Sequence, residues 1–172
     1  TNGAAIAVYN GATLVMNGGS ISNNAMNYDA IVILLPVIPC YPYGTLYVND
    51  ATATLNNVTI SDNTVGTSDA EGAAIYADSS TVTLNDCVVS GNINNEKVHY
   101  AESVIGAKNS TLTINNTDFT DNGKVSDTND IDYCSLFDLV NCKLTMTGGK
   151  ITGNLADKIF YLDDSKADIK GV

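Results

Sequence analysis

Short stretches of alternating apolar and polar residues recur along the whole chain. The clearest marker of this recurrence is a polar triplet that ends in asparagine, as in "SDN" at 61–63, "SGN" at 90–92 and "TDN" at 120–122. From Asn63 onwards these triplets are spaced 29 to 32 residues apart. The five closing asparagines are Asn24, Asn63, Asn92, Asn122 and Asn154. Such a fixed spacing is the mark of an internally repeated structure.

Apolar residues occupy equivalent positions in front of each closing asparagine. The first such column contains Leu14, Ala53, Val82, Leu112 and Leu144, the second contains Met16, Leu55, Leu84, Ile114 and Met146, and the third contains Ile21, Ile60, Val89, Phe119 and Ile151. The residues between them are mostly Thr, Asn, Asp, Lys or Gly. A period of two predicts strands that bury one face.

A further apolar pair precedes these strands in each repeat, and turn-forming residues separate the two. The pairs are Ile6/Val8, Leu46/Val48, Ile75/Ala77, Ile105/Ala107, Phe137/Leu139 and Phe160/Leu162. Each repeat therefore reads as strand, tight turn, strand, turn, short strand and loop. A single repeat of this kind cannot bury its apolar face, so the pattern predicts stacked parallel repeats, a β-solenoid. Propeller blades are the alternative, but they are longer and need antiparallel hairpins.

The repeats also resemble a known class of proteins. "GAAIYADSSTVTLNDCVVSGN" (72–92) and "SVIGAKNSTLTINNTDFTDN" (103–122) are similar to the degenerate repeats of right-handed parallel β-helix surface proteins, including adhesin-like proteins and polymorphic outer-membrane passengers with a pectate-lyase-like fold. The resemblance implies one all-β domain over 1–172, a single-stranded right-handed parallel β-helix of about six coils. Both ends read as partial coils, so we expect an excerpt of a longer protein with further coils of the same chain.

The most apolar stretch, "AIVILLPVIPCYPY" at 30–43, interrupts this pattern. Twenty-two residues separate Asn24 from Leu46, against 6 to 15 in the other repeats, so 30–43 reads as a loop insertion. One interpretation is a lid that packs on the body. The other is an exposed contact surface for a partner protein or sugar, because tyrosine rings stack on sugars. The residues expected to form this contact surface are Ile33, Leu35, Tyr41, Tyr43 and Tyr47.

Charge and composition narrow the range of partners. The net charge is −11 and all eight basic residues are Lys, so nucleic acid and acidic membranes are poor partners. No stretch has the ~20 consecutive apolar residues of a membrane-spanning helix, so we expect no membrane insertion. We expect an extracellular or cell-surface location, with a protein or glycan on a host or other cell surface as the partner.

Catalytic and metal-binding motifs are weak. "NTD" at 116–118 and "DD" at 163–164 resemble fragments of a glycosidase signature, but Asp118 falls in an outward column and the chain has no Arg. His99 reads as a surface histidine. We expect no enzyme activity and no cofactor, although Ca²⁺ is conceivable at three acids in "SDTNDID". These acids are Asp127, Asp130 and Asp132.

Three further features have mainly structural interpretations. Of the four cysteines, Cys87 is expected to be buried, and Cys134 and Cys142 flank one strand too far apart for a disulfide. Threonine pairs on successive repeats, such as Thr81/Thr83, suit an outer sheet face, and ice binding through such threonine ladders is a remote alternative. The column of closing asparagines is expected to form a ladder of side-chain amides at a recurrent bend.

The expected function is therefore a non-enzymatic adhesin-like or structural stalk module that presents variable loops on one face. The alternative is a carbohydrate-binding or carbohydrate-cleaving protein, a lyase or hydrolase, of the same fold.

Overall fold

The computed structural model describes residues 5–27, 44–66, 71–94, 102–124 and 134–172. Within them the chain is all-β, because every regular element is a strand and every strand pairing is parallel. The same part of the chain contains no helix with the length and apolar character needed to cross a membrane. The prediction of an all-β chain of parallel strands is confirmed.

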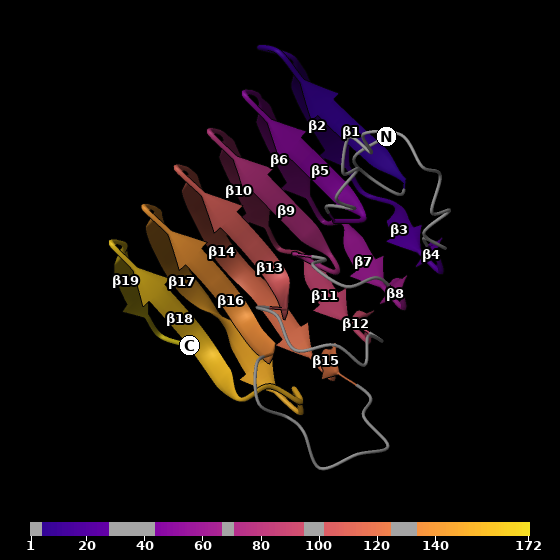
Figure 1. Ribbon diagram of the computed structural model, residues 1–172, viewed down its shortest axis with the longest axis vertical. Helices are drawn as coiled ribbons and strands as arrows, with labels where there is room; N and C mark the ends of the chain where they lie inside the picture. Colours follow the sequence, from indigo (N-terminus) through magenta and orange to yellow (C-terminus); the bar gives the residue numbers. More distant parts are fainter. Residues whose placement is uncertain (1–4, 28–43, 67–70, 95–101, 125–133) are drawn as a thin grey trace, which may run out of the picture.

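Three parallel sheets contain these strands (Figure 1). The first sheet has the order β1 (Ile6–Tyr9), β5 (Leu46–Asn49), β9 (Ile75–Asp78), β13 (Glu102–Lys108), β16 (Cys134–Val140) and β18 (Lys158–Asp163). The second sheet combines β2 (Thr13–Asn17), β6 (Thr52–Asn56), β10 (Thr81–Asn85), β14 (Thr111–Thr120), β17 (Lys143–Thr152) and β19 (Lys166–Lys170) with β3 (Ser20–Ser22), β7 (Thr59–Ser61) and β11 (Val88–Ser90). The third sheet has the order β15 (Gly123–Lys124), β12 (Ile93–Asn94), β8 (Thr64–Gly66) and β4 (Ala25–Asn27).

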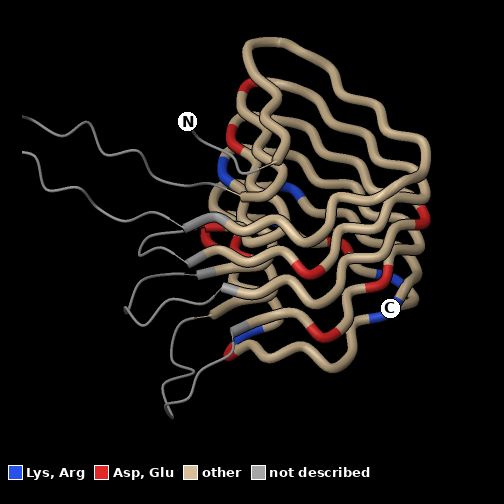
Figure 2. The backbone as a smooth tube through the Cα atoms, turned by 90° about the vertical axis from the view of Figure 1, so that its right-hand side faces the viewer, with Lys and Arg blue, Asp and Glu red and all other residues tan. Residues whose placement is uncertain are grey.

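Each strand pairs with its equivalents in the preceding and following repeats. Leu84 on β10, for example, is in register with Leu55 on β6 and with Ile114 on β14. In the first sheet Ile105 on β13 is in register with Ile75 and Phe137. The alignment of repeats predicted from the sequence is therefore confirmed as hydrogen-bonding register, and Figure 2 shows the repeats stacked one upon another.

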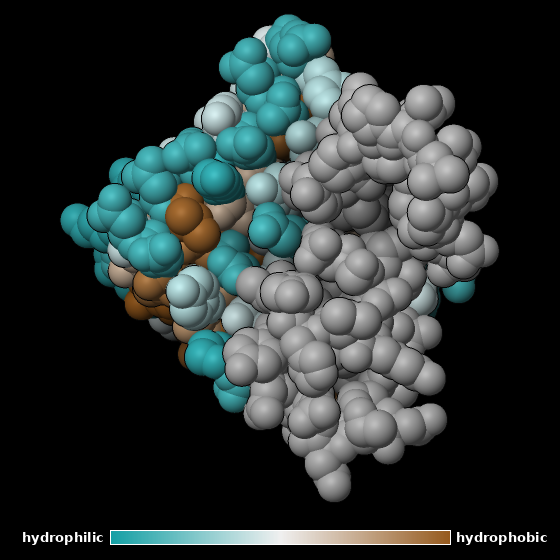
Figure 3. All heavy atoms as spheres, in the orientation of Figure 1, coloured by the Kyte–Doolittle hydropathy of each residue, from teal (hydrophilic) through white to brown (hydrophobic). Residues whose placement is uncertain are grey.

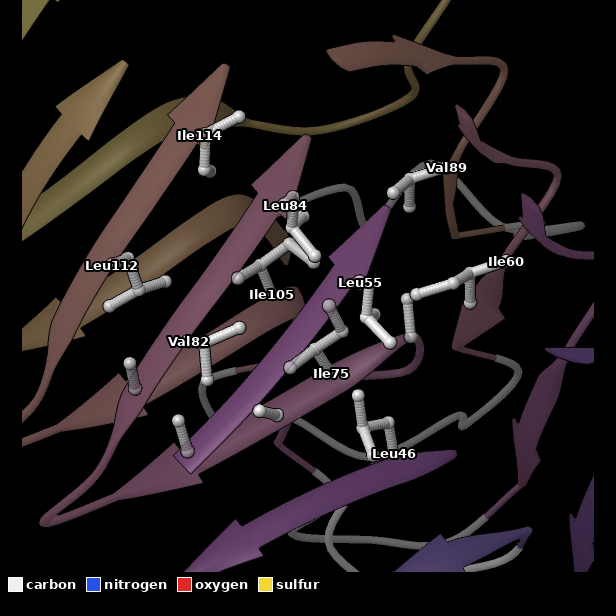
Figure 4. Packing of buried hydrophobic residues seen from close by; sticks show 14 of the residues in the cluster. Leu46, Leu55, Ile60, Ile75, Val82, Leu84, Val89, Ile105, Leu112 and Ile114 are labelled. Atoms are coloured by element: carbon white, nitrogen blue, oxygen red, sulfur yellow. The ribbon is translucent and has the colours of Figure 1, made fainter. Parts of the chain in front are cut away.

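The apolar columns meet between the sheets in one continuous core (Figure 4). Leu46, Leu55 and Ile60 are fully buried, and Phe119 packs edge-on against Phe137 with ring centroids 4.9 Å apart. Burial of each such side chain contributes about 1.5–3 kcal/mol. The core therefore ties every repeat to its neighbours, because each column continues through the stack.

The bends between strands place residues in left-handed backbone conformation at three equivalent positions of the repeat. The first column is Asn10, Asp50, Ser79, Asn109, Asn141 and Asp164, the second is Gly18, Asn57, Asp86, Asn116, Gly148 and Gly171, and the third is Asn23, Asp62, Gly91, Asp121 and Gly153. Asn, Asp and Gly are the residues that adopt positive φ at least cost. The polar residues at these bends are thus required by backbone geometry.

The third sheet was not predicted from the sequence. Its strands directly follow the closing asparagines and are only two or three residues long, as in β12. Such segments are too short to display a period of two, so they read as the start of a loop. The sheet continues beyond β15 through a parallel bridge between Gly123 and Leu155.

Candidate functional site

The five closing asparagines form a chain of side-chain hydrogen bonds along the bend between the second and third sheets. Asn24 Nδ2 donates to Asn63 Oδ1 at 2.9 Å, and Asn63 Nδ2 donates to Asn92 Oδ1 at 2.8 Å. Asn92 Nδ2 donates to Asn122 Oδ1 at 3.0 Å, and Asn122 Nδ2 donates to Asn154 Oδ1 at 3.0 Å. We call this chain the inner asparagine ladder.

The ladder amides also bind the backbone of the bend. Asn92 Nδ2 donates to the Ile60 carbonyl at 2.9 Å, while Asn92 Oδ1 accepts the backbone N–H of Asn63 at 3.3 Å. The side chain of Asn92 is fully buried, as is that of Asn63. Because buried polar groups need partners, these hydrogen bonds give the ladder a structural role.

A second asparagine ladder follows a different column and was missed at the sequence level. Asn56 Nδ2 donates to Asn17 Oδ1 at 2.9 Å, and the chain continues through Asn85 and Asn115 with donor–acceptor distances of 2.8 Å. Asn17, Asn56 and Asn85 end β2, β6 and β10, Asn115 lies within the longer β14, and all four remain accessible to water. Four asparagines at one repeat position were the signal in the sequence that would have revealed this ladder.

The residues expected at the contact surface lie mostly outside the described residues. This applies to Ile33, Leu35, Tyr41 and Tyr43, together with the rest of 30–43. Tyr47 is described, on β5, and it is 5% exposed. Its ring stacks on another tyrosine ring, so the expectation that Tyr47 forms an exposed tip is corrected. The candidate Ca²⁺ ligands Asp127, Asp130 and Asp132, as well as His99, also lie outside the described part.

The carboxylates considered for catalysis do not converge. Asp118 lies on the outer face of β14 and forms an ion pair with Lys150 on β17 at 3.0 Å. Asp163 ends β18 in the first sheet, and Asp164 occupies the following bend. Across the described residues, no three or more His, Cys, Asp or Glu side chains gather as metal ligands. Acidic residues are instead spread over successive repeats (Figure 2).

Two of the cysteines replace hydroxyl residues in ladders of side chain to backbone hydrogen bonds. Cys142 Sγ accepts the backbone N–H of Ser110 at 3.3 Å, and Ser110 Oγ accepts the backbone N–H of Ser80 at 3.0 Å. Cys87 is in the column of Thr117, whose Oγ1 accepts the Cys87 N–H at 3.3 Å. Cys87 is buried as predicted, and Cys134 and Cys142 are buried too and are not joined to each other by a disulfide. Burial raises the pKa of the Cys87 and Cys142 thiols, so both remain protonated near neutral pH.

The threonine pairs lie in register on the outer face of the second sheet. Thr54 on β6, Thr83 on β10 and Thr113 on β14 form one continuous column. This column continues through Thr145 and ends at Asp168, while Lys143 follows Thr111 in the neighbouring column, so both rows of hydroxyls are interrupted in the last repeats. In Figure 3, the visible surface of the described residues is mostly hydrophilic.

The outer face of the first sheet contains a column that combines tyrosines with a glycine and an aspartate. In order along the stack the column is Ala7, Tyr47, Tyr76, Gly106, Asp138 and Tyr161. The Tyr47 and Tyr76 rings stack nearly parallel, with an interplanar angle of 5° and centroids 5.9 Å apart. The tyrosine stack then stops at Gly106, which has no side chain to continue it.

A cavity of about 190 Å³ lies at this interruption. It is lined by Glu71, Tyr76, Gly106, Ala107, Lys108, Asp138 and Val140. We call it the Gly106 cavity. A Cβ atom at Gly106 would lie 2.9 Å from Tyr76 Cδ2 and 2.9 Å from Ser103 Oγ, so glycine permits the close approach of the tyrosine ring.

Two carboxylates and one amine surround the cavity. Burial, with the nearby charges of Glu71 and Asp163, raises the pKa of Asp138 to about 6. Asp138 therefore changes charge near neutral pH, and an oxygen of its carboxyl group can accept or, when protonated, donate a hydrogen bond. The sequence signal for this site was a glycine that follows two tyrosines at the same repeat position, which the search for apolar core columns did not register.

No protein-family model, curated protein or solved structure matches this chain.

Proposed function

We propose that the three parallel sheets form a single-stranded right-handed parallel β-helix of about six coils. The proposal is supported by strands that pair only with their equivalents about one repeat away, as in the alignment of β6, β10 and β14. Left-handed bends at three equivalent positions per repeat also support it, because they turn the chain from one sheet to the next. The twist preference of parallel crossover connections favours the right hand.

We further propose that the chain is a non-enzymatic extracellular module, either adhesin-like or a structural stalk. The observation that carries this proposal is the location of the variable-length connections. The longest ones all run from a strand of the third sheet to the next strand of the first sheet, as between β4 and β5 or between β15 and β16. Loops of unequal length on one side of a regular scaffold are typical of recognition surfaces.

The scaffold itself is suited to a load-bearing or presenting role. The inner asparagine ladder and the continuous core couple each repeat to the next, so the stack behaves as one body. The partner in this proposal is a protein or glycan on a host or other cell surface, and the net charge of −11 disfavours anionic polymers.

Carbohydrate binding is the second candidate function, and the Gly106 cavity favours it. Its lining includes Asp138 and Lys108, whose side chains can accept hydrogen bonds from, and donate them to, the hydroxyl groups of a sugar. Carbohydrate cleavage has less support, because Asp118 and Asp163 lie on different sheets.

The adhesin-like function is tested by attaching the purified chain to beads and measuring their retention on cultured cells and on a glycan array. A variant without residues 31–42 is compared with the intact chain, and circular dichroism checks that both remain β-folded. Retention that disappears in the folded deletion variant supports recognition by the inserted loop. The absence of retention for both chains on every surface contradicts an adhesin and leaves the stalk.

A further inference from the structure

The outer face of the second sheet presents two columns of threonine side chains on β2, β6, β10, β14 and β17, which Figure 1 shows side by side. The first column is Thr13, Thr52, Thr81 and Thr111, and the second is Thr54, Thr83, Thr113 and Thr145. We call these eight residues the threonine array. Each of them is exposed or half-buried, so water reaches both columns.

The hydroxyl groups of the array are not used within the protein. In the part of the chain that the structure describes, none of the eight forms a side-chain hydrogen bond. The neighbouring asparagine column on the same face differs, because Asn85 donates to Asn56 and Asn115 donates to Asn85. Each hydroxyl group of the array can therefore donate and accept hydrogen bonds outside the chain.

The scaffold fixes the positions of these hydroxyl groups. Neighbouring parallel strands lie about 4.8 Å apart, and the register places one threonine on each successive strand of a column, as in Thr54, Thr83 and Thr113. Threonine is branched at Cβ, so its χ1 angle has few accessible values. The array is therefore a regular grid that is formed before any ligand arrives, which reduces the entropy lost on binding.

The chemistry of this face disfavours most classes of ligand. The outer positions of β2, β6 and β10 carry only Thr, Asn and Val15, so they offer no charge to an ion, although the chain has a net charge of −11. The same three strands contain no aromatic ring that could stack on a sugar. An apolar partner would bury the hydroxyl groups without giving them hydrogen bonds, which is costly.

A crystal of water meets these requirements. In a tetrahedral network with O···O hydrogen bonds of about 2.75 Å, two water molecules bonded to the same neighbour lie about 4.5 Å apart. This period is close to the spacing of about 4.8 Å between neighbouring strands. Successive hydroxyl groups of one column can therefore bond to successive oxygen positions of ice, and many weak hydrogen bonds on one rigid grid act together.

We propose that the threonine array binds the surface of ice. The array ends where charged side chains enter its columns, because Lys143 follows Thr111 and Asp168 follows Thr145. The proposal goes beyond the adhesin-like function and does not depend on it. The array lies on the second sheet, whereas the longest connections join the third sheet to the first.

The test is nanolitre osmometry on the intact chain, which measures the gap between the melting and freezing temperatures of a single ice crystal. The expected result is a measurable gap together with faceted crystals. Thr81→Lys should remove both, because a lysine in the middle of the array keeps ice from approaching it. The fold accommodates lysine in this column, since Lys143 and Lys166 occupy it in later repeats, and circular dichroism checks the variant.

Thr152→Lys serves as the matched control. It makes the same replacement at an exposed threonine of β17 that lies beyond the bend at Gly148, outside the array, so it should leave the gap unchanged. The proposal is overturned if the intact chain produces neither a gap nor faceted crystals, or if both variants lose activity equally. It is also overturned if the intact chain leaves ice unaffected but is retained on cellulose or chitin and Thr81→Lys abolishes this retention, because the array then recognises a neutral polysaccharide.

Discussion

Replacement of Asn92 by alanine removes the central member of the inner asparagine ladder. In the native chain Asn92 Oδ1 accepts hydrogen bonds from Asn63 Nδ2 at 2.8 Å and from the Asn63 backbone N–H at 3.3 Å. Its Nδ2 donates to the Ile60 carbonyl at 2.9 Å and to Asn122 Oδ1 at 3.0 Å. Asn122 Oδ1 keeps one donor in the variant, the Asn92 backbone N–H at 3.0 Å.

The expected loss of stability follows from the groups left without partners. The variant leaves the backbone N–H of Asn63 and one hydrogen of its buried amide without an acceptor. Each costs about 1–3 kcal/mol, and the truncated side chain leaves a small void, so the free energy of unfolding should fall by about 3–5 kcal/mol. For a chain of this size that corresponds to a decrease in Tm of about 6–20 °C.

Asn24→Ala is the matched control at the end of the same ladder. Asn24 Nδ2 donates to Asn63 Oδ1 at 2.9 Å, but Asn63 Oδ1 also accepts the Asn24 backbone N–H at 3.0 Å. No buried donor is left without a partner, so this variant should lose only about 1 kcal/mol. Urea unfolding followed by far-ultraviolet circular dichroism measures both. Equal losses in the two variants would refute the reasoning, because they would show that burial of the ladder donors contributes nothing.

Three other predictions concern a bend, a thiol and a carboxyl group. Gly148→Ala should lower the free energy of unfolding by about 1 kcal/mol, because Gly148 has a positive φ. Gly149→Ala should lower it by at least about 2 kcal/mol more, because the added Cβ would also clash with the Thr117 carbonyl oxygen. Urea unfolding measures both losses, and equal losses would contradict this prediction. Cys142→Ser should keep stability within about 1 kcal/mol, whereas Cys142→Ala should lose about 1–2 kcal/mol because the Ser110 N–H loses its acceptor. Because burial raises its pKa, the Cys142 thiol of the native chain should react with iodoacetamide at pH 8 far more slowly than the same thiol in the urea-unfolded chain. Mass spectrometry measures both rates, and equal rates would contradict this prediction. The pKa of Asp138 is raised from 3.8 to about 6, so the native state holds a proton that the unfolded state releases, and stability should fall as pH rises from about 4 to about 6. Tm measured across this pH range should therefore fall less in the Asp138→Asn variant than in the native chain. An equal fall in both chains would show that Asp138 is not the group that titrates, because Glu71, Lys108 and Asp163 are present in both.

The sequence determined the repeat, the strands of the first two sheets and their register. Core columns such as Leu55, Leu84 and Ile114 are apolar in every repeat because each position faces the same interior, so aligning the chain with itself predicts which residues pair. The closing asparagines could be predicted from the sequence for the same reason. Each side-chain amide forms a hydrogen bond with the equivalent amide one repeat away, so asparagine recurs at this position in each repeat.

The tertiary structure decided what the alternation of apolar and polar residues does not encode. The third sheet has strands of two or three residues, too short for a period to appear. Tyr47 is buried, and Tyr9 and Tyr76 from neighbouring repeats pack against its ring, contacts that its own strand does not reveal. Tyr76, Gly106 and Asp138 line one cavity because the stacking brings their three repeats side by side. Interior positions face the same core in every repeat, so they recur as apolar residues and can be recognised from a single sequence. The contacts on the outer face cannot, because they depend on which different side chains the stacking of the repeats brings together.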